Sequence, residues 1–179
     1  MTATLLHLSW ICRGTLAMVF AVAVFTKIRG VAAFVRFRDG ATTLTGVRGR
    51  PAALLAGLVV AGEAVAAAGS VVTATAPWAA ATAGVLLSAF TWRLARTPGS
   101  DVAAACGCFG SAVTTRGVGL LRNVVLLAVS AGAVAGTLAT RGTRGGDLAG
   151  PLVCVAAAAL LAACVVRLHD IASAFLTGW

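Results

Sequence analysis

Charged residues are scarce in this sequence. Only 11% of its 179 residues are Asp, Glu, Lys or Arg, whereas 60% are hydrophobic, and the mean hydropathy is +0.99. Soluble globular domains are about 25% charged and about 45–50% apolar. A chain of this length cannot bury so much apolar surface in a soluble core, so we expect the lipid bilayer to be its solvent. The sequence shows no internal repeat, soluble domain or disordered linker, so residues 1–179 are predicted to form a single membrane domain.

Candidate metal ligands are also few. The two histidines, His7 and His169, lie far apart in the sequence, and a structural zinc site needs about four defined ligands. No metal is therefore expected. Five cysteines cannot all pair within one chain, which excludes a fully paired disulfide scaffold. The net charge is +9, but no basic face carries interleaved aromatic side chains, so we expect no binding to nucleic acid.

Five apolar runs have the composition of transmembrane helices. At about 1.5 Å per residue, roughly 20 residues cross the hydrocarbon core. The predicted spans are residues 5–25, 51–75, 77–94, 118–140 and 148–166. The predicted fold class is therefore an all-α membrane protein, a bundle of about five transmembrane helices. Residues 21–23 resemble a signal-peptide cleavage site, but residues 1–11 are apolar rather than basic, so we expect the first span to be retained.

The loop at residues 26–50 is strongly basic. It holds six Lys or Arg residues and one acid, Asp39. Four apolar residues alternate with its arginines: Val31, Phe34, Val35 and Phe37. Two interpretations remain open. The segment is either a short interfacial helix with its apolar side in the lipid headgroups, or a plain basic connector.

The feature with evident chemistry is the pair Cys106 and Cys108, within residues 103–111. This apolar run is too short to span a membrane, so we expect a re-entrant or interfacial Cys-Gly-Cys-Phe-Gly loop between the third and fourth spans. Cysteines two residues apart can close a strained disulfide, and strained disulfides are oxidising and labile. Gly107 supplies the backbone freedom that such a ring requires. The alternative is two ordinary buried cysteines.

The residues around this pair suggest how its thiols would be tuned. Four arginines are close in sequence and would favour the reactive thiolate: Arg93, Arg96, Arg116 and Arg122. Cys164, near the end of the fifth span, lies on the same side of the predicted bundle. It is either a third thiol of the site or a structural residue. Cys12 and Cys154 fall nearer the other side and are predicted to be packing residues.

Glu63 is predicted to lie near the middle of the second span. An acid at that depth is costly and usually has a partner inside the bundle. We expect Arg13 or Arg122 to be that partner, unless Glu63 is protonated. Glu63 would either take up and release protons or join two helices through a polar contact. In the fourth span, Gly132-x-x-x-Gly136 is a motif of close helix packing.

The distribution of basic residues predicts the orientation in the membrane. With five spans, the first loop, the cysteine loop and the C-terminus share a face that carries most of the Lys and Arg residues. By the positive-inside rule this face is cytoplasmic. We therefore expect a multi-pass protein of the plasma membrane, with its N-terminus outside and the cysteine loop inside.

The sequence resembles a known family. The run Cys106-Gly107-Cys108-Phe109-Gly110 is similar to the Cys-x-Cys-Phe-Gly signature of the methylamine utilisation protein MauE family, which is related to DoxX-like membrane proteins. Lys27 after the first span, Glu63 in the second span and Arg122-Asn123 at the start of the fourth match the family in the same order. The resemblance covers about residues 10–140.

This resemblance implies a redox-associated accessory protein of thiol–disulfide oxidoreductase type. Founding members are needed to mature methylamine dehydrogenase and act beside a thioredoxin-like partner. The implied partners here are the bilayer and a thioredoxin-like protein or a secreted client. No cofactor is specified by the residues, and a quinone is compatible with them. The implied site has Cys106 and Cys108 as catalytic residues, with these in support: Glu63, Arg122, Asn123, Lys27 and Cys164.

Two other functions and one conflict stay open. A non-catalytic membrane scaffold or assembly factor, or a small transporter centred on Glu63, is consistent with the same sequence. The family's presumed work lies outside the cytoplasm, whereas the charge distribution places the cysteines inside. Either an electron relay at the inner face, or a loop deep enough to be reached from both sides, would reconcile the two.

Overall fold

All regular secondary structure in the part of the chain that the structure describes is helical. The computed structural model describes residues 2–96, 116–140 and 149–167. The helices are α1 (Thr2–Ile28), α2 (Val31–Thr45), α3 (Arg50–Val71), α4 (Ala76–Arg96), α5 (Arg116–Ala139) and α6 (Ala149–Val166). The predicted all-α class is confirmed, and the five long helices coincide with the predicted spans to within a few residues at each end.

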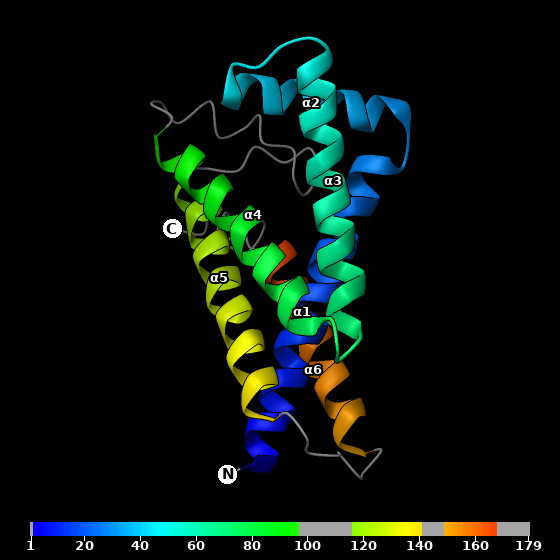
Figure 1. The fold of residues 1–179 in the computed structure, drawn as a ribbon, viewed down its shortest axis with the longest axis vertical. Coiled ribbons are helices and arrows are strands. Elements are labelled where there is room, and N and C mark those ends of the chain that lie inside the picture. Colours follow the sequence, from blue (N-terminus) through cyan, green and yellow to red (C-terminus); the bar gives the residue numbers. More distant parts are fainter. Residues whose placement is uncertain (1, 97–115, 141–148, 168–179) are drawn as a thin grey trace, which may run out of the picture.

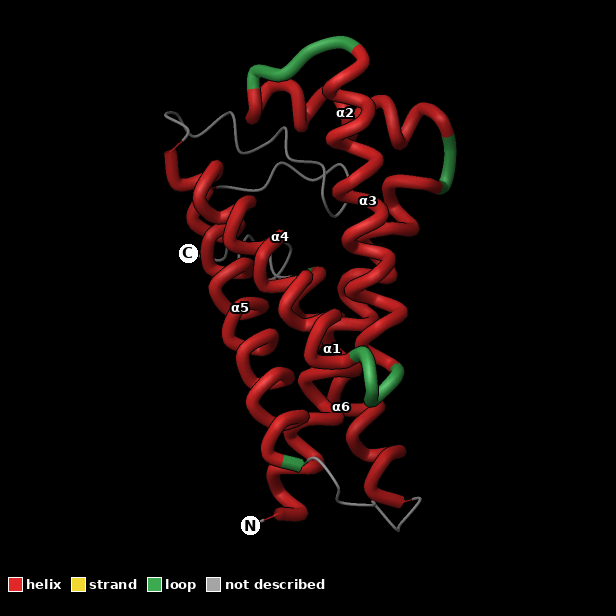
Figure 2. Tube along the Cα trace, in the orientation of Figure 1, coloured by secondary structure: helices red, strands yellow, loops and turns green. Residues whose placement is uncertain are grey.

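The five long helices run alternately up and down, and α2 lies across one end of them (Figure 1). We call this the α2 end: α1 and α4 finish there, and α3 and α5 begin there. Helix α1 is central, because it packs against α3, α5 and α6, while α4 packs against α3 and α5. A short turn joins the ends of α3 and α4 that point away from α2 (Figure 2).

Within the described residues, three helices are long and apolar enough to cross a membrane. These segments are Thr4–Ile28, Arg50–Val71 and Gly117–Ala139, and a shorter apolar helix covers Val153–Val166. Large apolar side chains point outward, as Leu54 and Leu58 of α3 do, each 70% exposed. Such a surface fits lipid rather than water. The membrane character is therefore confirmed, and the number of five spans stays a prediction.

Small residues on the inner faces let the helices approach closely. A Cβ added at Gly136 would lie 2.8 Å from the Cβ of Ser9, and one added at Gly132 would lie 3.2 Å from the Sγ of Cys12. Across the same contact, the hydroxyls of Ser9 and Thr137 form a 3.3 Å hydrogen bond. The glycine motif of α5 is thus a packing surface for α1, as motifs of this kind are in other membrane helices.

Arg13 of α1 caps the end of α3. Its Nε donates to the carbonyl of Ser70 at 3.0 Å and its Nη2 to the carbonyl of Val71 at 2.9 Å. The guanidinium also lies 4.7 Å from the centroid of the Trp10 ring. The last carbonyls of a helix lack partners within it and carry its partial negative charge. A buried arginine therefore satisfies the end of α3 and is itself neutralised there.

The basic segment after α1 forms a true helix, so the interpretation as a plain connector is wrong. Helix α2 ends at Thr45 and is capped by Gly46, whose φ of 75° is left-handed and whose N–H donates to the carbonyl of Thr42 at 2.8 Å. Its inward face carries Ala33 and Phe37, which are 8% and 3% exposed. Phe37 therefore packs on the bundle instead of facing the headgroups. Whether the rest of α2 lies in the headgroup region stays a prediction.

We predict that Gly136→Ala destabilises the protein, because the new methyl group would force α5 away from Ser9. Overpacking of this kind costs about 1–3 kcal/mol. The matched control is Gly57→Ala in α3, where an added Cβ meets nothing within 4 Å. It should keep or raise the midpoint of thermal unfolding in detergent, since alanine favours helix by about 1 kcal/mol. Equal midpoints for the two variants would contradict the close α1–α5 contact.

We also predict that Arg13→Met lowers the free energy of unfolding by about 2–4 kcal/mol, because two hydrogen bonds from a charged donor are lost and two carbonyls remain unpaired. Arg48→Met, at an exposed position before α3, serves as the control and should change stability by less than about 0.5 kcal/mol. Denaturant unfolding in detergent measures both. A loss at Arg13 no larger than that at Arg48 would exclude the capping role.

Candidate functional site

A buried ion pair joins α1 to α3. The Nζ of Lys27 donates to both carboxylate oxygens of Glu63, at 2.5 Å to Oε1 and 2.6 Å to Oε2. The two side chains are 1% and 4% exposed. A charge in such a place is tolerated only when it is paired, so neither Lys27 nor Glu63 could remain charged there without the other. The pair joins the last turn of α1, which precedes α2, to the middle of α3.

Helix α2 covers this pair. The Nζ of Lys27 lies 4.7 Å from the centroid of the Phe37 ring, a cation–π distance. Lys27 also stands in the last turn of α1, where a cation is favoured by the negative end of the helix dipole. Three elements therefore converge on one ammonium group: the end of α1, the carboxylate of α3 and the aromatic ring of α2.

The partner of Glu63 differs from the one expected. The prediction named Arg13 or Arg122, whereas the observed partner is Lys27. Arg13 precedes Lys27 by 14 residues on α1, about 21 Å along the axis. Because α1 and α3 are antiparallel, Arg13 reaches the end of α3 instead of its middle. The contact between Phe37 and Lys27 was not predicted, because a spacing of ten residues gives no signal of such a contact by itself.

Asn123 of α5 is a further buried polar residue. It lies seven residues, about two helical turns, from the start of that helix at the α2 end. Asn123 is 6% exposed. We call Lys27, Glu63 and Asn123 the polar layer. Arg122, the adjacent residue of α5, is half-buried.

Cys106 and Cys108 lie outside the described residues. The connection that contains them, residues 97–115, begins after Arg96 at the end of α4 and returns at the start of α5. Both attachment points are at the α2 end. The polar layer and the ends of the cysteine segment thus belong to the same half of the molecule.

The other three cysteines are free thiols in different surroundings. Cys12 and Cys154 are buried, at 8% and 3% exposure, and the Sγ of Cys154 donates to the carbonyl of His7 at 3.7 Å. Both are packing residues, as predicted. Cys164 is exposed on α6 and lies toward the α2 end of that helix. Among the described residues, no three His, Cys, Asp or Glu side chains gather as metal ligands do.

The sequence matches the model of a known protein family. The description of the matching family is methylamine utilisation protein MauE, and the match covers residues 5–139, which is α1 to α5. No curated protein and no solved structure matches the chain. Helix α6, docked on α1, lies beyond the matched region. Since the match spans well over half of the sequence, including Lys27, Glu63, Asn123 and the cysteine pair, the chain belongs to the methylamine utilisation protein MauE family of membrane proteins.

Proposed function

We propose that this protein is a redox-associated membrane protein that supports thiol–disulfide exchange in the maturation of a partner protein, with Cys106 and Cys108 as the reactive pair. The observation that carries the proposal is the Cys-Gly-Cys-Phe-Gly sequence within the region matched to the family. The founding members' client, methylamine dehydrogenase, is the example of such a partner. A thioredoxin-like protein or a secreted client is the partner class that fits.

The buried polar layer supports this assignment. Intramembrane ionisable residues are costly, and they are usually found where a protein has a function to perform. Here Lys27 and Glu63 lie in the half of the bundle to which both ends of the cysteine segment attach. The pair is neutral as a unit, so it adds polarity without adding net charge. We assign it the role of positioning this end of the bundle around the thiols.

The proposed reaction is an exchange between two dithiol–disulfide couples. A thiolate of the partner attacks the Cys106–Cys108 disulfide, and a mixed disulfide forms as the bond between the two sulfurs breaks. The second partner thiolate then releases the reduced pair. Two electrons pass from the partner to Cys106 and Cys108, the partner gains a disulfide, and protons are taken up by the released thiolates. Reoxidation requires an electron acceptor, and a quinone is the chemical class that we propose.

The charge distribution supports a plasma-membrane protein with five spans, the cysteine segment on the cytoplasmic side and the N-terminus outside. A secreted client then requires a cysteine loop deep enough to be reached from both sides. Labelling of Cys106 and Cys108 by a membrane-impermeant maleimide, applied from one side at a time, reports this orientation. A scaffold without redox activity is the second candidate, favoured by the close glycine contacts between α1 and α5.

We predict that Cys106 and Cys108 titrate as one two-electron couple. In a variant with Cys12, Cys154 and Cys164 replaced by alanine, the protein is equilibrated with mixtures of reduced and oxidised dithiothreitol and then alkylated. The ratio of doubly alkylated to unalkylated protein should change tenfold for each change of roughly 30 mV in the redox potential of the mixture. Cys108→Ser should remove this transition and abolish client maturation, while the amount of protein in the membrane is unchanged. A double serine variant that still matures its client would refute the redox role and favour the scaffold.

We predict that Lys27→Met and Glu63→Gln each destabilise the protein by about 3–5 kcal/mol, because the other group is left buried without its partner. The double variant should lose less than the sum of the two. The control is the exposed pair Arg38 and Asp39, whose side chains are 38% and 59% exposed and 2.8 Å apart. Exposed pairs of this kind contribute about 0–1 kcal/mol.

The double variant also separates a structural role from a functional one. If Lys27 and Glu63 position the redox site, the double variant should regain stability while client maturation stays impaired. Full recovery of both would show that the pair only links α1 to α3. A loss of stability in the double variant equal to the sum of the two single losses would contradict the ion pair itself.

A further inference from the structure

The α2 end carries an unbalanced basic surface. Arg36 projects from α2, and Arg29, Arg48 and Arg50 lie in or next to the two connections that flank it. All four are exposed, and none forms an ion pair with a described residue. We call these four residues the arginine surface. They share one end of the molecule because α2 turns the chain across the bundle (Figure 1).

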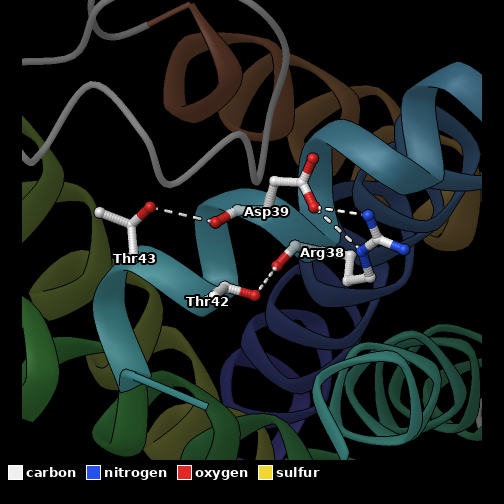
Figure 3. Close-up of polar contacts among 4 residues, drawn as sticks. All are labelled: Arg38, Asp39, Thr42 and Thr43. Carbon is white, nitrogen blue, oxygen red and sulfur yellow. Dashed lines mark hydrogen bonds and ion pairs between the residues drawn. The ribbon is translucent and has the colours of Figure 1, made fainter. Parts of the chain in front are cut away.

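The only acid in this stretch is already engaged. Asp39 accepts hydrogen bonds from the guanidinium of Arg38, at 2.9 Å from Nε and 2.8 Å from Nη2 (Figure 3). The hydroxyls of Thr42 and Thr43 donate to backbone carbonyls of α2, at 3.0 Å and 3.1 Å. These polar groups of α2 are therefore bonded within the helix, and no carboxylate of the described residues forms an ion pair with the arginine surface.

Exposed apolar side chains border this surface. Phe25 and Ile28 at the end of α1 are 65% and 57% exposed, and Val31 at the start of α2 is 83% exposed. Arg29 stands between them in sequence. An apolar border that changes to exposed arginine within a few residues is typical of the boundary between acyl chains and headgroups. An acidic soluble protein would match the arginines but would leave these apolar side chains without a partner.

We infer that the arginine surface binds the headgroups of anionic phospholipids. Guanidinium groups bind phosphate with two parallel hydrogen bonds, and they keep their charge at any physiological pH. Clustered basic residues beside a transmembrane helix gain affinity for an anionic leaflet. The lipid contact holds α2 against the end of the bundle, and α2 carries Phe37 over the ammonium of Lys27. Lipid charge is thereby coupled to the packing around the buried ion pair.

The test uses the full-length protein in nanodiscs made from equal parts of phosphatidylglycerol and phosphatidylcholine. Lipids that remain bound after gentle transfer to detergent are counted by native mass spectrometry. At low salt we expect bound phosphatidylglycerol to exceed phosphatidylcholine by at least about fivefold, the factor that corresponds to one basic residue at an anionic surface. High salt should reduce this ratio toward one, because exposed charges are screened.

The variants remove four charges at the α2 end or two charges in the connection between α5 and α6. Replacement of Arg29, Arg36, Arg48 and Arg50 by glutamine should bring the lipid ratio to about one. Arg141→Gln and Arg144→Gln, in the connection between α5 and α6, should leave it within twofold of the original protein, as should the double change of Arg29 and Arg36 to lysine. A ratio near one for the original protein, or an unchanged ratio in the glutamine variant, would overturn the inference. Binding of polyglutamate by the original protein with no lipid preference would assign the surface to an acidic protein instead.

Discussion

Two cations on α1 must be neutralised inside an apolar bundle, and both find their partners on α3. Arg13 donates hydrogen bonds to the last carbonyls of α3, and Lys27 donates to the carboxylate of Glu63. Because the two helices are antiparallel, these contacts together specify how far one is displaced along the other. A slip by one turn would leave a buried charge without its partner, at a cost of several kcal/mol. The α1–α3 register is therefore the constraint on which the remaining contacts depend.

The other helices join α1 through small residues rather than through charge. Gly132 and Gly136 of α5 approach Cys12 and Ser9, and Gly14 of α1 faces Ala158 of α6 at a distance that leaves no room for a Cβ. In lipid there is no hydrophobic force between helices, so close packing and interhelical hydrogen bonds must hold them. A bulky residue at these positions would displace a whole helix. The small residues therefore allow α5 and α6 to pack directly on α1 at the centre of the bundle.

The α2 half of the molecule combines a buried ion pair with exposed arginines. The α2 end holds the polar layer and the arginine surface, and both ends of the cysteine segment attach there. Helix α2 connects these features, since its inward ring lies over Lys27 while Arg36 points away from the bundle.

The sequence by itself determined the helical class, the approximate bounds of the five long helices, the unusual position of Glu63 and the family. These follow from local properties: the length of apolar runs, the cost of an acid within them, and a short cysteine motif. Only the tertiary structure decided that Glu63 pairs with Lys27 and not Arg13, that Gly136 meets Ser9, and that Phe37 turns inward. Each of these joins distant positions, and the partner is set by the relative displacement and direction of two helices. No spacing along a single helix carries that information, because several antiparallel registers bury the same apolar faces equally well.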